Sequence, residues 1–109
     1  MAKKDSPGAL TEAVFYILLV LEKPTHGYGI MQTIEELTAG RVKLGPGTLY
    51  GALSTLTEKK WIEQLGHVRA KGKKEYVLTD LGREVLAGEI GRLEELLRHA
   101  ATYGKENES

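Results

Sequence analysis

Apolar residues recur at helical spacing near the start of the chain. They are Leu10, Ala13, Val14, Ile17, Leu18 and Leu21. Because they share one face at 3.6 residues per turn, they predict a first helix that packs on the core and ends before Pro24. Phe15 and Leu19 lie on the opposite face, so a second surface must cover them. We expect that cover to be a subunit interface or a ligand pocket.

A second helix is predicted over residues 25–37, with Thr25 as its N-cap and residues 38–40 as its end. The inward positions are Ile30, Met31, Ile34 and Leu37. Gly27 and Gly29 each weaken the first turn by up to about 1 kcal/mol relative to alanine. They indicate that the backbone closely approaches another group, either a packed neighbour or a phosphate.

A third helix begins at Pro46, which needs no N–H partner in the first turn. Leu49, Leu53 and Leu56 form its only apolar stripe. The outward and flanking positions are Gly47, Tyr50, Gly51, Ser54, Thr55 and Glu58. Such small groups allow a helix to approach the floor of a DNA groove.

Two short strands are predicted next, at residues 61–65 and 75–78. Gly66 and Gly72 bracket the segment between them. This segment and its end carry Arg69, Lys71, Lys73 and Lys74. The pattern predicts a hairpin with a cationic tip that attracts phosphate.

The last helix is predicted over residues 79–103, capped by Thr79. Its apolar residues step by four and three, as in a coiled coil. They are Leu86, Ile90, Leu93, Leu97 and Ala100. Gly88 and Gly91 lower the intrinsic stability of this helix, so it needs packing, either against a second copy or back on its own subunit.

Composition restricts the protein to one small domain of ordinary polarity. The 109 residues are 41% hydrophobic and 28% charged, with a net charge of zero. Residues 41–74 carry eight basic and two acidic side chains, a local charge of +6 that can orient the protein on a polyanion or form an ordinary solvated surface. The chain has no cysteine, and the apolar run at 13–21 is too short for a membrane span. These features predict a cytoplasmic protein without membrane contact.

Catalytic and metal-binding motifs are missing from the sequence. His26, His67 and His99 are isolated, no serine lies in a glycine elbow, and no phosphate-binding glycine loop occurs. We therefore expect neither an enzyme nor a cofactor or metal.

Three motifs in order carry a resemblance to a known family. They are residues 25–30 (THGYGI), residues 46–50 (PGTLY) with Leu53 and Leu56, and residues 73–79 (KKEYVLT) with Gly82. Together they resemble the PadR family of bacterial transcriptional regulators, in its short branch with a single C-terminal helix. Gly51 departs from the common proline of the family, and Glu75-Tyr76 departs from its two wing aromatics. The only tryptophan is Trp61 and not a residue of the last helix, which argues against drug stacking as in some short-branch members.

The resemblance implies a mainly α fold with a small β-wing, a winged helix-turn-helix. The implied divisions are a flexible start (1–8), a DNA-binding domain (9–78), a dimerisation helix (79–103) and a flexible tail (104–109). The DNA-binding candidates are Lys43, Gly47, Thr48, Tyr50, Gly51, Ser54, Thr55, Arg69, Lys71, Lys73 and Lys74. Tyr50 corresponds to a DNA-contact position of the family, although a tyrosine there could also pack under the wing.

The resemblance also implies a homodimer, acting as a repressor at an inverted-repeat operator and released by an apolar or aromatic effector or another signal. The candidate dimer and effector residues are Phe15, Leu19, Leu86, Ile90, Leu93, Leu96 and Leu97. These residues fit a filled interface as well as an open pocket. Two other hypotheses remain: a winged-helix module that binds an acidic protein, which Glu58 favours, and a small-molecule carrier.

Overall fold

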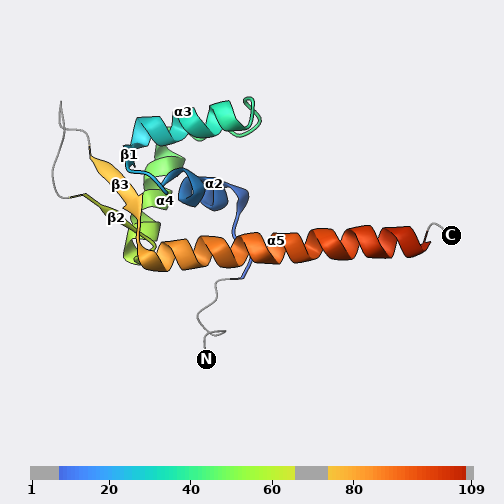
Figure 1. Cartoon of the computed structure of the whole chain (residues 1–109). Coiled ribbons are helices and arrows are strands. Elements are labelled where there is room, and N and C mark those ends of the chain that lie inside the picture. Colours follow the sequence, from blue (N-terminus) through green and yellow to red (C-terminus); the bar gives the residue numbers. More distant parts are fainter. Residues whose placement is uncertain (1–7, 66–73, 108–109) are drawn as a thin grey trace.

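The computed structural model describes residues 8–65 and 74–107. Its elements follow in chain order: α2 (Glu12–Val20), β1 (Thr25–His26), α3 (Gly27–Leu37), α4 (Pro46–Glu58), β2 (Ile62–Gln64), β3 (Glu75–Leu78) and α5 (Asp80–Asn107). The wing consists of β2, β3 and the segment between them. The strands form one antiparallel sheet in the order β1-β3-β2. Figure 1 shows α2, α3 and α4 grouped beside this sheet, with α5 passing along the group and beyond it. The expected mainly α fold with a small β-wing is confirmed.

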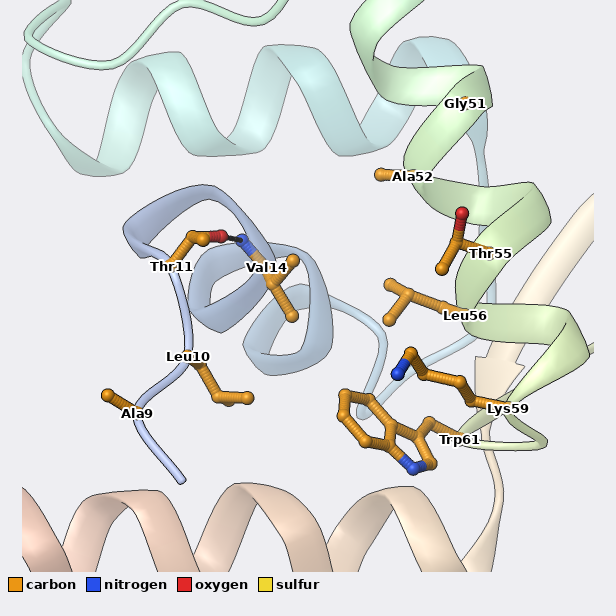
Figure 2. Close-up of a pocket in the computed structure, with 10 residues that line it drawn as sticks. All are labelled: Ala9, Leu10, Thr11, Val14, Gly51, Ala52, Thr55, Leu56, Lys59 and Trp61. Carbon is orange, nitrogen blue, oxygen red and sulfur yellow. Dashed lines mark hydrogen bonds between the residues drawn. The ribbon is translucent and has the colours of Figure 1, made fainter. Parts of the chain in front are cut away.

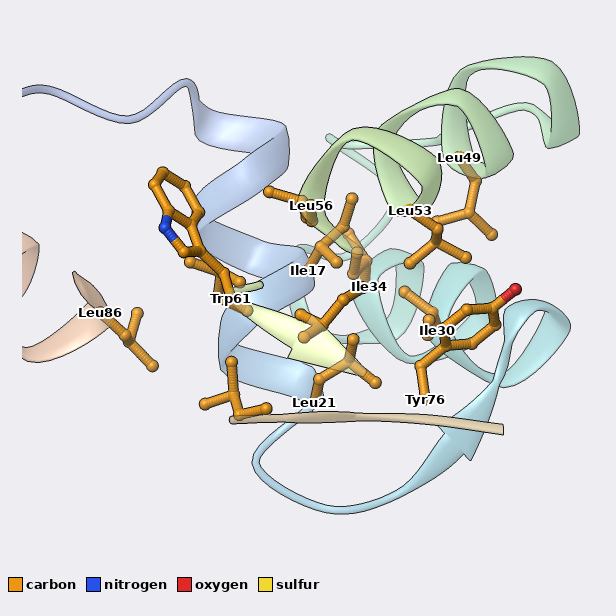
Figure 3. Close-up of a cluster of buried hydrophobic side chains, with 13 residues drawn as sticks. Ile17, Leu21, Ile30, Ile34, Leu49, Leu53, Leu56, Trp61, Tyr76 and Leu86 are labelled. Carbon is orange, nitrogen blue, oxygen red and sulfur yellow. The ribbon is translucent and has the colours of Figure 1, made fainter. Parts of the chain in front are cut away.

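One hydrophobic core joins the first three helices to the sheet and to the start of α5 (Figure 3). Ile17 and Leu18 of α2 and Ile30 and Ile34 of α3 are fully buried. The apolar stripe of α4 is buried as predicted, with Leu49, Leu53 and Leu56 at most 2% exposed. Burial of each such side chain contributes about 1.5–3 kcal/mol to folding, so α4 is firmly held from one side only.

The first helix, α2, is apolar on more than one side, as the sequence predicts. Thr11 caps it, because the Thr11 hydroxyl accepts a hydrogen bond of 3.1 Å from the Val14 N–H. Phe15 and Leu19 pack partly on the core and keep part of their surface exposed. The single subunit therefore covers these two side chains incompletely.

The start of α3 corrects one prediction. Thr25 lies in β1 opposite Tyr76, and His26 is the N-cap, whose Nδ1 accepts a hydrogen bond of 3.1 Å from the Gly29 N–H. Thr25 was wrong as the cap because its backbone pairs with β3. Leu37 was wrong as an inward position, since it lies 57% exposed in the last turn.

The end of α3 follows the prediction. Ala39 and Gly40 adopt φ angles of 53° and 83°, a left-handed stop after the helix. The Thr38 hydroxyl accepts a 3.0 Å hydrogen bond from the Val42 N–H and donates one of 2.9 Å to the Ile34 carbonyl. These bonds fix the turn that leads to α4.

Packed side chains explain both glycines in the first turn of α3. A Cβ atom on Gly27 would lie 2.2 Å from Tyr50 Oη, and one on Gly29 would lie 2.4 Å from Thr25 Oγ1. The close approach predicted there is thus made within the protein, between the start of α3 and the neighbouring elements.

The last helix, α5, begins on the core and continues beyond it. The Thr79 hydroxyl accepts a 3.0 Å hydrogen bond from the Gly82 N–H, which confirms Thr79 as the cap, and donates one of 2.6 Å to the Lys60 carbonyl. From Leu93 to Gly104 every residue is exposed. The helix reaches Asn107, beyond the predicted bound of 103. One glycine at position 104 costs too little to end a helix that is already propagating.

The residues between α4 and β2 are in direct contact with the start of α5. The Thr79 N–H donates a 3.0 Å hydrogen bond to the Trp61 carbonyl, and a Cβ atom on Gly82 would lie 1.9 Å from that same oxygen. Only glycine lets the two backbones approach so closely, so the start of α5 forms a tight joint with Trp61, which follows α4.

Candidate nucleic-acid interface

The outer face of α4 is exposed among the described residues. Gly45 precedes this helix and Pro46 begins it, and the three leucines hold its inner face. The predicted small residues are all exposed: Gly47, Thr48, Gly51, Ser54 and Thr55. No Cβ added at Gly47 or Gly51 would meet an atom within 4 Å. A flat surface without long side chains therefore lies along the helix, as close approach to a groove requires.

Tyr50 lies at the edge of this surface. It is 48% exposed, and its phenol packs over Gly27 at the start of α3. The pKa of Tyr76 is raised, first by burial and then by the nearby Tyr50. Tyr50 thus contacts the start of α3 and still exposes about half of its surface, so its role in DNA contact stays a prediction.

The base of the wing is well ordered by its strands. Strand β2 pairs with β3 in the register Ile62 to Leu78, and the Leu65 N–H donates a 2.8 Å hydrogen bond to the Glu75 carbonyl. Lys74 is exposed at this base. The other predicted wing cations, Arg69, Lys71 and Lys73, lie outside the described residues.

Some of the basic charge before α4 is already paired. Lys43 is exposed with its Nζ 3.8 Å from Glu35 Oε2, and Arg41 hydrogen-bonds Glu12. The bond to Arg41 lowers the pKa of Glu12, although Glu12 is on the surface. Lys43 therefore has less free charge for a polyanion than its position in the sequence suggests.

Two further lysines, Lys59 and Lys60, follow α4. They were not among the predicted site residues. Lys59 and Lys60 are exposed, and the Lys59 ammonium lies 5.1 Å from the centre of the Trp61 ring. Their positions directly after the predicted DNA-reading helix could have identified them as candidates for phosphate contact.

The predicted dimer residues divide into two groups. Leu86 is 2% exposed and belongs to the core of its own subunit, so it was wrongly placed on the seam; it faces Trp61 and the sheet because the first turns of α5 lie on the core. The remaining seam residues are exposed: Ile90 (37%), Leu93 (36%), Leu96 (49%) and Leu97 (70%). A stripe of this kind on a projecting helix is unusual for an isolated subunit.

Metal sites and membrane spans can be examined in residues 8–65 and 74–107. In this part of the chain, no three histidine or acidic side chains gather as metal ligands. None of its helices combines the length and apolar character that a membrane span requires.

The sequence profile of the transcriptional regulator PadR-like family matches residues 17–88, which run from α2 to the middle of α5. The chain belongs to the PadR-like family. Proteins of this family are transcriptional regulators, in agreement with the exposed outer face of α4.

Individual PadR-like relatives match in sequence and in structure. The chain is 40% identical over 80 residues to an uncharacterized 37.1 kDa protein in transposon TN4556 of Streptomyces fradiae, which covers 72% of this chain but only 22% of that protein. A PadR family transcription regulator from Clostridium difficile has a TM-score of 0.71 at 24% identity, with 84% of this chain and 96% of that chain covered.

A third PadR-like relative was solved with DNA. Bacillus subtilis PadR in complex with operator DNA has a TM-score of 0.65 at 25% identity, with 73% of this chain and 47% of that chain covered.

Proposed function

We propose that this PadR-like protein is a sequence-specific regulator that binds double-stranded DNA with the outer face of α4 and with the wing. The observation that carries the proposal is the exposed row of small residues on α4. The sequence between β2 and β3 adds basic residues, Arg69, Lys71 and Lys73. In a helix-turn-helix protein the start of this helix reaches the base edges. The operator complex of Bacillus subtilis PadR supports the same use of the fold.

Two copies would bind together through α5. From Leu93 to Gly104 every residue of α5 is exposed in one subunit, and most helical stability in proteins comes from packing of an apolar face. A second α5, with the half-covered Phe15 and Leu19, would bury the seam. A symmetric dimer would then recognise an inverted repeat whose half-sites are about 34 Å apart.

Repression and release are the regulatory part of the proposal. A dimer bound at a promoter excludes polymerase by occupancy. An apolar or aromatic effector between Phe15, Leu19 and the α5 seam would change the angle between the two α4 helices and weaken binding. This part depends on the dimer, whereas DNA binding by one subunit does not.

Selection of DNA from a random double-stranded library tests the proposal. We expect an inverted repeat to be enriched, and its Kd to be at least about a thousandfold below that of scrambled DNA. Ser54→Glu, on the outer face of α4, should abolish binding by placing a carboxylate against the DNA, whereas Lys23→Met, on a distant turn, should leave it unchanged. If no sequence is enriched and an acidic protein binds the same face, the protein is an interaction module.

The wing has its own test, the salt dependence of binding. Replacing Lys71 and Lys73 by alanine should reduce the slope of log Kd against log salt by up to about two, because each phosphate contact releases about one counterion. An unchanged slope would show that these lysines do not contact phosphate.

A further inference from the structure

Lys60, the second residue after α4, has an unusual backbone conformation. Its φ angle is 66°, in the left-handed region that residues with a Cβ atom rarely adopt. Glycine most often occupies this position after a helix, because it has no Cβ atom. A lysine here therefore makes the fold less stable than a glycine at the same place would.

Hydrogen bonds on both sides hold Lys60 in this conformation. Its N–H donates a 3.0 Å hydrogen bond to the Thr57 carbonyl, and its carbonyl accepts one of 2.6 Å from the Thr79 hydroxyl. The next N–H, of Trp61, donates a 3.1 Å hydrogen bond to the Leu56 carbonyl, as is usual where a left-handed residue ends a helix. The backbone of Lys60 is thus fixed by α4 and by the start of α5, and so is the direction in which its side chain leaves the backbone.

The charge of Lys60 is unpaired within the part of the chain that the structure describes. Lys60 is exposed and forms no ion pair there, not even with its exposed neighbour Glu58. The end of a helix favours a cation, but Lys59 already provides one, with its ammonium 5.1 Å from the centre of the Trp61 ring (Figure 2). The Lys60 ammonium is therefore available to another molecule.

The dimensions of DNA bring a phosphate close to such a side chain. A helix of 13 residues is about 20 Å long, whereas the major groove is about 12 Å wide. If the start of α4 reaches into the groove, the end of α4 leaves the groove beside a sugar–phosphate backbone. A lysine at that end would neutralise a phosphate and release a counterion.

We infer that Lys60 is a phosphate contact of the DNA interface, and that its left-handed conformation serves this contact although it lowers the stability of the fold. This inference rests on the proposed function, in which α4 binds in the groove. Lys60 adds affinity without sequence preference, because phosphates carry no sequence information. One substitution should therefore change stability and DNA affinity in opposite directions.

Lys60→Gly is that substitution. In urea unfolding, its equilibrium constant for unfolding should be about threefold below that of the wild type, because glycine relieves the left-handed backbone. Binding to the selected operator should weaken about fivefold at low salt, and the slope of log Kd against log salt should fall by about one per subunit. Binding to scrambled DNA should weaken to the same extent, as a phosphate contact requires.

Three control variants separate these effects. Ala39→Gly relieves another left-handed residue, whose φ is 53°, so it should stabilise the protein similarly and leave DNA binding unchanged. Lys60→Arg keeps both the cation and the left-handed backbone, so it should match the wild type in stability and in salt slope. Lys23→Met removes one positive charge from a distant turn and should leave the salt slope unchanged.

Several outcomes would overturn the inference. If Lys60→Gly binds DNA with the affinity and the salt slope of the wild type, Lys60 does not contact phosphate. If it loses affinity for the operator alone, the contact is to a base. If it is no more stable than the wild type, the left-handed lysine carries no cost in stability. Absence of DNA binding by the wild type would instead refute the proposed function, on which the contact depends.

Discussion

The two parts of α5 lie in different surroundings although they form one continuous helix. The first part, from Asp80 to Arg92, holds the buried Leu86 and Glu89 and the tight contact of Gly82 with Trp61. The second part, from Leu93 onward, is exposed throughout its described side chains. The same heptad pattern runs through both parts, so spacing specifies which side of a helix is apolar and leaves open which surface covers it.

A pair of alanine substitutions compares the parts most directly. Leu86→Ala should lower the free energy of unfolding by about 2–5 kcal/mol, because it opens a cavity in the core. This loss should not depend on protein concentration. Leu97→Ala should instead lower the melting temperature by an amount that changes with concentration, since Leu97 would be buried only between subunits. Thermal unfolding at several concentrations measures both, and a concentration-independent Leu97→Ala effect would contradict the proposed dimer.

Two glycines of α5 should respond in opposite directions. Gly82→Ala should destabilise the protein by about 1–3 kcal/mol, because its Cβ would collide with the Trp61 carbonyl. Gly88→Ala should stabilise it by about 0.5–1 kcal/mol, because alanine favours the helix. The added Cβ would lie within 4 Å of no described atom outside the neighbouring helix backbone. Denaturant unfolding compares the two variants. If Gly82→Ala leaves the free energy of unfolding unchanged, Gly82 and the Trp61 carbonyl are not in close contact.

The contribution of Glu89 to the free energy of unfolding should depend on pH. Its hydrogen bonds from Arg92 hold the pKa of Glu89 below its usual value near 4.5, against the opposing effect of burial. A lowered pKa in the folded state stabilises the protein above pH 4.5, and this stabilisation is lost as the pH falls through the folded-state pKa. Glu89→Gln should thus be less stable than the wild type at pH 7, and the difference should shrink below pH 4.5. A constant difference would exclude the carboxylate as its source.

Glu95 is the matched residue in the exposed part. Its carboxylate lies 4.0 Å from His99 Nε2, and both side chains are more than half exposed. Glu95→Gln should therefore change the free energy of unfolding by less than about 0.5 kcal/mol. A loss comparable to that of Glu89→Gln would show that the second part of α5 is also packed.

Much of the fold could be predicted from periodicity. The stripe of α4, the stop after α3, the Thr79 cap and the strand pair all follow from the spacing of leucines and from turn residues. The family motifs identified Gly82, but its physical reason, contact with the Trp61 carbonyl, appears only in three dimensions. The burial of Glu89 and the use of His26 as a cap could not be predicted, because each depends on a partner distant in sequence or on competition with sheet pairing.

The candidate site was predicted in outline. Exposure of the small residues on α4 followed from the leucine stripe opposite them. The pairing of Lys43 with Glu35 and the packing of Tyr50 on Gly27 could not be predicted, because the sequence does not show which residues lie next to a side chain in the fold. The sites for DNA and effector remain proposals.

The joint at Gly82 has a mechanical consequence. A helix of 28 residues is a rod about 42 Å long, and the residues at its start contact Lys60 and Trp61, which follow α4. A rotation of about 5° at that end moves the far tip by almost 4 Å. The rod therefore acts as a lever arm, because a slight movement of its tip produces a very small rotation next to α4. The close contact of Gly82 with the Trp61 carbonyl would transmit this rotation.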